Sequence, residues 1–166
     1  MSHKHLFFLR LPRLLLGSLL FILLLQACGE KAYFSENAML PDEGWTHDHQ
    51  VSFTIPVSDT AGRYGLYLDI DHSTEYLFQN VYVNIFTTLP DGTETSQLLP
   101  IDFADKAGNW YGDCTSSRCD LRVTLQERTY FNQLGSYRIT LEQATRNNPL
   151  RGINALELKL ITDSAP

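Results

Sequence analysis

Two stretches near the C-terminus decide the fold: Tyr137-Arg138-Ile139-Thr140-Leu141 and Leu156-Glu157-Leu158-Lys159-Leu160. In each stretch an apolar side chain alternates with a polar one. Successive side chains of a β-strand point to opposite faces of the sheet, so this period of two is what a strand with one buried face requires. We therefore predict half-buried strands at residues 137–141 and 156–160.

The same period recurs closer to the N-terminus, from Val51 onward. The clearest further runs are Tyr64-Gly65-Leu66-Tyr67-Leu68-Asp69-Ile70, Val81-Tyr82-Val83-Asn84-Ile85-Phe86 and Leu121-Arg122-Val123-Thr124-Leu125. Between the runs lie residues that tolerate positive φ or preset a turn, in the segments 60–62, 90–92, 106–109, 133–135 and 147–149. In no run do apolar residues recur at every third and fourth position, as they would along one face of a long helix. We predict an all-β fold, with a single antiparallel β-sandwich of about seven or eight strands over residues 51–166.

The N-terminus has the pattern of a bacterial lipoprotein signal peptide. Three basic residues, Lys4, Arg10 and Arg13, precede an uncharged apolar run from Leu14 to Leu25, which is followed by Gln26, Ala27 and Cys28. The alternative is a membrane-spanning helix, which needs about 20 apolar residues. Only 16 residues, Leu14 to Gly29, lack charge here. We therefore predict cleavage that removes residues 1–27 and lipidation of Cys28.

The mature chain would run from Cys28 to Pro166, which is the length of one domain. Residues 28–50 are mostly polar and include Pro41 and Gly44, so we expect a lipidated N-terminus and a short tether there. Residues 28–166 contain ten Lys and Arg against 19 Asp and Glu, a formal net charge of −9. Nucleic-acid binding depends on clustered basic residues, so nucleic acid is not expected as a partner. Membrane attachment should come from the acyl chains on Cys28.

No catalytic constellation appears in the sequence. There is no Gly-x-Ser-x-Gly elbow, His-Glu-x-x-His helix or Gly-rich phosphate loop. His47 and His49 could point the same way in an extended segment, but a metal site needs further ligands, so a solvated pair is the favoured interpretation. We predict a protein that is not an enzyme, with no catalytic residues, no metal site and no cofactor.

Cys114 and Cys119 are separated by four residues. A zinc ribbon would need a second such pair, and a redox dithiol usually has two intervening residues. An exported protein meets an oxidising environment. We therefore predict a local disulfide that braces a loop between strands.

The loop Asn109-Trp110-Tyr111 is the candidate contact site for a protein partner or a glycan. Indole and phenol rings can stack on a sugar or pack against a protein surface. The alternative is that Trp110 folds back to cover the edge of the sandwich, and both interpretations stay open at this point.

Several stretches, taken in order, resemble the GldH-type gliding-motility lipoproteins of Bacteroidetes. They are residues 76–83 (Tyr-Leu-Phe-Gln-Asn-Val-Tyr-Val), 89–92 (Leu-Pro-Asp-Gly), 108–112 (Gly-Asn-Trp-Tyr-Gly), 135–137 (Gly-Ser-Tyr) and 143–153, which includes Asn147-Asn148-Pro149. The resemblance implies a cell-envelope lipoprotein that serves gliding motility and the associated type IX secretion system. Its implied partners are other envelope proteins of those machines.

Two further expectations concern location and an alternative function. Residues 29–31 (Gly-Glu-Lys) lack the Asp that is often associated with inner-membrane retention, so we expect the outer membrane. The alternative function is a glycan-binding β-sandwich lipoprotein of the envelope.

Overall fold

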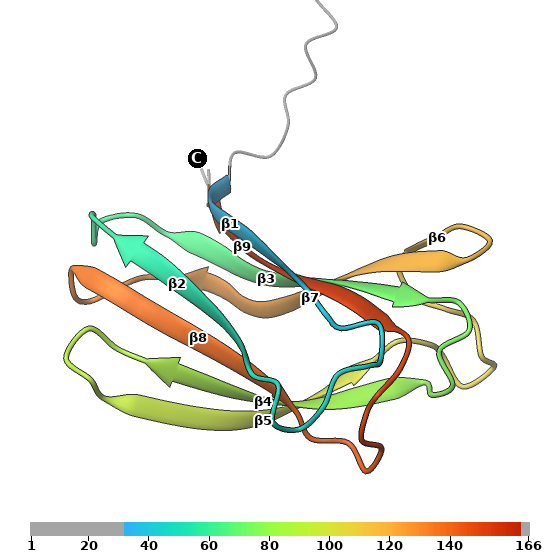
Figure 1. Ribbon diagram of the computed structural model, residues 1–166. Coiled ribbons are helices and arrows are strands. Elements are labelled where there is room, and N and C mark those ends of the chain that lie inside the picture. Colours follow the sequence, from blue (N-terminus) through green and yellow to red (C-terminus); the bar gives the residue numbers. More distant parts are fainter. Residues whose placement is uncertain (1–31, 164–166) are drawn as a thin grey trace, which may run out of the picture. The chain divides into compact units, whose positions relative to one another are not determined.

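A computed structural model describes residues 32–163, and these residues form nine strands in two antiparallel sheets that pack face to face (Figure 1). The strands are β1 (Ala32–Met39), β2 (Val51–Val57), β3 (Tyr64–Ser73), β4 (Asn80–Thr88), β5 (Glu94–Asp102), β6 (Asp113–Cys114), β7 (Arg118–Thr129), β8 (Gly135–Gln143) and β9 (Ile153–Thr162). One sheet has the order β1-β9-β3-β7-β6 and the other β2-β8-β4-β5. The described part of the chain contains no helix that could span a membrane. The predicted all-β sandwich is confirmed. The signal peptide 1–27 and Cys28 lie outside the described residues.

The core lies between the two sheets and is built by the alternation that the sequence shows. In β2 every second side chain is buried, and β8 and β9 bury the apolar members of the two stretches that open the sequence analysis. Fully buried side chains of the interior include Phe53, Ile55, Leu68, Leu141, Leu158, Leu160 and Phe103. Burial of such apolar surface is the main stabilising contribution to a fold of this kind.

The predicted tether is wrong in its extent. β1 pairs with β9 from Ala32 to Met39, so the sandwich begins at residue 32 and not at residue 51. The segment that follows is also part of the domain, because Leu40 and Trp45 are buried. Trp45 forms an isolated antiparallel bridge with Leu150. β1 is an edge strand with mixed burial, and this weakens the apolar alternation by which a strand is recognised in a sequence.

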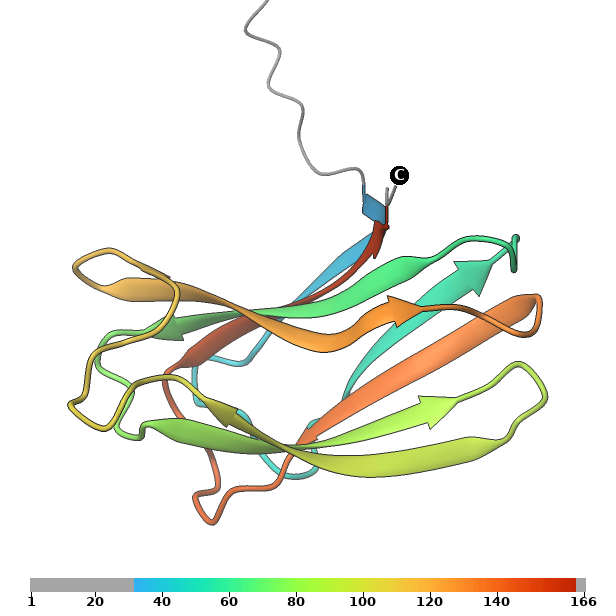
Figure 2. The same cartoon turned by 180° about the vertical axis from the view of Figure 1, so that it is seen from behind.

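The strands define two opposite ends of the sandwich, seen from both sides in Figures 1 and 2. One end, here called the terminal end, holds Ala32, Asp163 and the loops 58–63, 89–93 and 130–134. The other, here called the disulfide end, holds the connections 74–79, 103–112 and 115–117 together with β6. These names are used below.

Candidate interaction surface

Backbone hydrogen bonds join the three connections at the disulfide end. The N–H of Phe103 donates to the carbonyl of Gln79 (2.7 Å), and the N–H of Tyr111 donates to the carbonyl of Phe103 (2.7 Å). Thr74 donates to the carbonyl of Ser117 (3.1 Å). The 74–79 loop is therefore held between the other two connections, and the end is one bonded unit.

The predicted disulfide is present between Cys114 and Cys119. It closes the β6–β7 hairpin, where the N–H of Thr115 also donates to the carbonyl of Arg118 (2.8 Å). Cys119 is fully buried and stands opposite His72 of β3. The covalent link therefore fixes the short strand β6 to the start of β7, and its role is local bracing.

We expect the double substitution Cys114→Ala and Cys119→Ala to lower the free energy of unfolding by about 2 kcal/mol, because closing so short a loop removes little unfolded-state entropy. Chemical denaturation of the oxidised protein and the variant measures the difference. The native protein under reducing conditions is the control and should match the variant. A loss of the whole β-sheet signal would show that the disulfide is required for folding.

Four aromatic rings form a cluster inside the disulfide end. The ring of His72 stacks on Phe103 (centroids 4.6 Å apart) and meets Trp110 edge-on (5.0 Å), and Tyr76 packs against both His72 and Phe103. Burial raises the pKa of the Tyr76 phenol, which donates to the carbonyl of Asn80 (3.0 Å). The cluster gives the loops a rigid base.

Trp110 packs on this cluster and is partly buried. Its placement agrees with the alternative in which the indole covers the edge of the sandwich. Asn109 donates its side-chain amide to Asp105 (2.8 Å), whose carboxylate also accepts from the backbone of Ala107 and Asn109. Tyr111 is exposed, at 44%, and Asn109 is exposed as well. The structure thus uses Asn109 and Trp110 to shape the loop and leaves Tyr111 on its surface.

Two exposed apolar side chains at this end were not predicted from the sequence. Leu77 is 86% exposed and Phe78 is 38% exposed, and both lie in the loop between β3 and β4. Phe78 packs edge-on against Tyr76 (5.6 Å). The available signal was the run Tyr76-Leu77-Phe78, three large apolar residues in a loop, where polar residues are usual. Exposed apolar residues on a rigid loop are typical of a protein contact.

The histidine pair does not gather further ligands. His47 forms a hydrogen bond through Nε2 to the carbonyl of Thr145 (2.8 Å), and its backbone N–H donates to Asn148. Across residues 32–163, no group of three or more His, Cys, Asp or Glu could hold a metal ion.

Carboxylates on the outer face of the five-stranded sheet belong to ion pairs. Asp69 accepts two hydrogen bonds from Arg122 (2.8 and 3.0 Å) and one from Lys159 (2.8 Å). Arg118 pairs with Asp71 (3.1 Å) on the neighbouring part of the sheet. Partial burial alone raises the pKa of Asp69, but the bonds from Arg122 and Lys159 outweigh it and lower the pKa below its ordinary value.

Replacing Asp69 with Asn should lower the free energy of unfolding by about 1 kcal/mol at neutral pH, since the paired side chains are only partly buried. The folded-state pKa of Asp69 lies below its unfolded value of about 3.9, so the ion pairs stabilise the fold above about pH 4 and this contribution is lost as the pH falls further. Denaturation curves from pH 7 downward should therefore fall less steeply for the variant in acid. The control is Asp120→Asn, which removes only an exposed ion pair with Arg118 (3.2 Å) and should therefore behave nearly as the native protein.

The fold and surface define a small β-sandwich module with a rigid loop end, and the comparisons with known proteins identify its family. The chain belongs to the GldH lipoprotein family, whose profile matches residues 32–160. It is 26% identical over 137 residues to the gliding motility lipoprotein GldH homolog of Christiangramia forsetii, covering 82% of this chain and 83% of the relative. It is 26% identical over 140 residues to the gliding motility lipoprotein GldH of Flavobacterium johnsoniae, covering 84% and 86%. The resemblance stated from the sequence is confirmed.

Proposed function

We propose that this protein is a lipid-anchored, non-enzymatic accessory component of gliding motility and of the associated type IX secretion machinery. The family match over residues 32–160 carries the proposal, because it covers almost the whole sandwich. The named role of the two relatives in gliding motility supports the first part. The link to type IX secretion rests on what the resemblance implies.

Anchoring through Cys28 at the outer membrane is the second part of the proposal. The sequence Leu25-Gln26-Ala27-Cys28 supports lipidation, and Gly29-Glu30-Lys31 supports the outer membrane. Two or more acyl chains hold a protein firmly, since each buried methylene contributes about 0.8 kcal/mol. In this view the protein acts by keeping a folded surface in place next to larger envelope assemblies.

The disulfide end is the surface that we propose for contact with those assemblies. Leu77, Phe78 and Tyr111 are its exposed apolar residues, and the backbone bonds and the disulfide hold their loops in fixed positions. A rigid contact surface loses little conformational entropy on binding. This role needs no ionisable groups converging in a cleft.

The substitution Cys28→Ala tests the proposal in a gliding bacterium that depends on this protein. We expect the variant to move from the membrane fraction to the soluble fraction, and both cell spreading and secretion of a type IX cargo to fall to the level of a deletion strain. The matched control is Thr54→Ala, because Thr54 is an exposed residue of β2 that belongs to neither the anchor nor the disulfide end. Full spreading and secretion by a soluble Cys28→Ala protein would contradict the proposal.

A further inference from the structure

We propose that the terminal end of the sandwich faces the membrane surface and contacts neutral phospholipid headgroups, so that the disulfide end points away from the bilayer. This inference rests on the lipidation of Cys28 proposed above. It names a second partner surface on the protein and fixes which of its ends is available to other proteins.

The connection between anchor and fold is short. Three residues, 29–31, separate Cys28 from Ala32, where β1 begins. A fully extended chain covers about 3.5 Å per residue, so the Cα atoms of Cys28 and Ala32 can be no more than about 14 Å apart. A membrane-bound Cys28 therefore keeps the start of β1 close to the headgroups.

β1 is also firmly attached where it enters the sandwich. Ala32 pairs with Ile161 of β9, and the ring of Tyr33 packs on Tyr64 of β3 (4.9 Å). The hydroxyl of Tyr33 donates to the carbonyl of Pro56 in β2, which belongs to the other sheet (3.2 Å). Both sheets thus hold the strand that leads to the anchor, so the domain cannot move away by releasing a loose segment.

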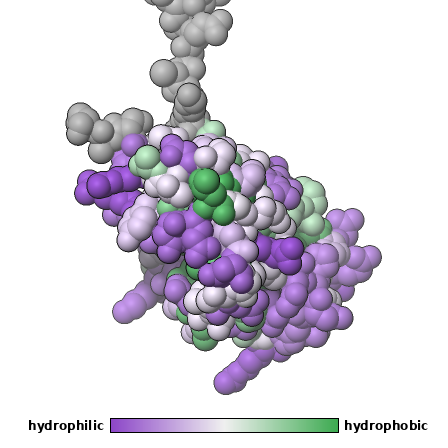
Figure 3. Space-filling model, turned by 90° about the vertical axis from the view of Figure 1, so that its left-hand side faces the viewer, coloured by the Kyte–Doolittle hydropathy of each residue, from purple (hydrophilic) through white to green (hydrophobic). Residues whose placement is uncertain are grey.

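The terminal end carries side chains that suit an interface. Tyr130 is 72% exposed and Leu134 is 62% exposed, and both lie in the loop between β7 and β8. Tyrosine is enriched at membrane interfaces because its ring is apolar and its hydroxyl can remain hydrated. Figure 3 faces this end and shows hydrophobic residues as separate spots in a largely hydrophilic surface. This pattern favours contact at headgroup depth over deep insertion.

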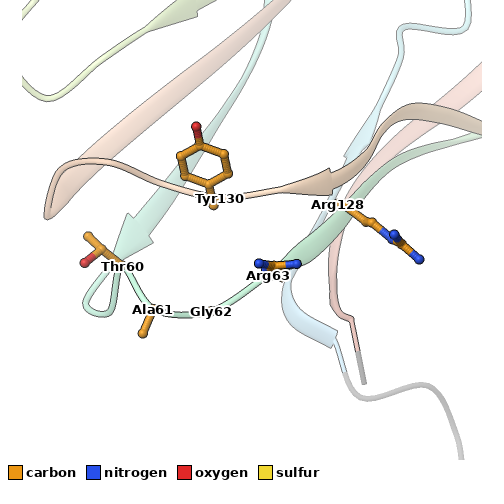
Figure 4. Close-up of a pocket in the computed structure, with 6 residues that line it drawn as sticks. All are labelled: Thr60, Ala61, Gly62, Arg63, Arg128 and Tyr130. Atoms are coloured by element: carbon orange, nitrogen blue, oxygen red, sulfur yellow. The ribbon is translucent and has the colours of Figure 1, made fainter. Parts of the chain in front are cut away.

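Next to Tyr130 lies a surface hollow that could receive a headgroup phosphate. It is lined by Thr60, Ala61, Gly62, Arg63, Arg128 and Tyr130, which come from the β2–β3 loop and the region around the end of β7 (Figure 4). Guanidinium groups bind phosphate oxygens well.

Acidic residues balance these arginines. A carboxylate oxygen of Asp163 lies 3.7 Å from Nε of Arg128. The same loops, or positions beside them, also hold Asp59, Asp91 and Glu127. The terminal end therefore has no excess of positive charge that would require anionic lipid. The phosphate and the ammonium group of a zwitterionic headgroup can face the basic and the acidic side chains, respectively.

In the proposed orientation the two ends of the sandwich lie at different distances from the bilayer. β3 has ten residues and runs from the terminal end to the disulfide end. At about 3.3 Å per residue it spans about 30 Å. Leu77, which follows β3 at the disulfide end, would then lie about 30 Å farther from the bilayer than Tyr130 or Leu134.

A photoreactive benzoyl-phenylalanine tests this orientation in the full lipidated protein, reconstituted in vesicles of neutral phosphatidylcholine. It is placed at 134 or 130 in the terminal end, or at 77 in the disulfide end, and all three side chains are exposed, so the fold should tolerate it. After illumination, mass spectrometry measures the fraction of protein that carries a phospholipid adduct. We expect adducts at 134 and 130 to be at least about tenfold more abundant than at 77, given the difference in height.

The same spectra report the acyl chains on Cys28, so the two proposals fail in different ways. Lipidated protein with equal adduct yields at the three positions would overturn the orientation and leave the proposed function in place. An unmodified Cys28 would overturn the proposed anchor and, with it, the orientation.

An insertion of 20 Gly and Ser residues between Glu30 and Lys31 is the matched control. A flexible linker of this length has an end-to-end distance of about 25 Å, close to the height of the domain. Adduct yield at 134 should fall several-fold in the inserted protein. An unchanged yield would show that the short connection does not set the orientation.

Discussion

Replacing Trp45 with Ala is expected to lower the free energy of unfolding by about 3–5 kcal/mol, because it empties a fully buried site of the largest side chain. The indole also donates from Nε1 to the carbonyl of His49 (2.7 Å). The backbone of Trp45 exchanges two hydrogen bonds of 2.8 Å with Leu150. The backbone of Trp45 therefore joins the segment after β1 to the segment before β9, and loss of the buried ring that holds this backbone in the core should loosen both.

Urea denaturation, monitored by circular dichroism, measures the change in the free energy of unfolding of the domain. Trp110→Ala is the matched control, since it removes the same side chain from a partly buried position and should cost clearly less. If Trp45→Ala lowered the free energy of unfolding by as little as Trp110→Ala, the segment around Trp45 would contribute little to the stability of the domain.

His72 should respond in opposite ways to two substitutions. The imidazole is fully buried among Phe103, Trp110 and Tyr76, so His72→Ala leaves a cavity and should cost about 3 kcal/mol. His72→Phe keeps the ring and should leave stability within about 1 kcal/mol of the native value or raise it. The reason is that Nε2 of His72 is buried with no hydrogen-bond partner among the described residues, and an unpaired buried polar atom is costly.

The change to Phe also removes the hydrogen bond between Nδ1 and the carbonyl of Ser73 (3.0 Å). That carbonyl keeps a donor, the N–H of Tyr76 (3.1 Å), so the loss is small. Thermal unfolding of the two variants beside the native protein separates the contributions of ring packing and imidazole chemistry. A His72→Phe protein as unstable as His72→Ala would show that the imidazole is required in its own right.

The central strands could be predicted from the sequence because each has one face against the core. β3, β8 and β9 show the expected alternation of buried and more exposed side chains. The edge strands β1 and β5 lack that contrast, since most of their residues are exposed or only partly buried. The edge strand β2 keeps the alternation because its alternate residues are buried, so low burial and not edge position alone hides β1 and β5 in the sequence. Such strands depend on pairing with a distant partner, about which a period of two carries little information.

Only those features of the candidate site that depend on neighbouring residues could be predicted from the sequence. The spacing of Cys114 and Cys119 is local, and the disulfide follows from it. The burial of Trp45 and His72 depends on partners far along the chain, such as Leu150 and Phe103, which no local pattern reveals. The sequence leaves both interpretations of the loop 109–111 open, because the cluster that takes up Trp110 assembles only in the fold.

The pairing of β1 with β9 has a mechanical consequence for a protein attached at its N-terminus. β1 starts at the terminal end and lies antiparallel along β9 for its whole length. A pull between the anchor and a partner at the disulfide end would load the hydrogen bonds of this pair in shear, so that they resist together. A pull between Ala32 and the end of β9, which lie side by side, would instead unzip the bonds one after another. Attachment at opposite ends therefore gives the sandwich its greater resistance to force.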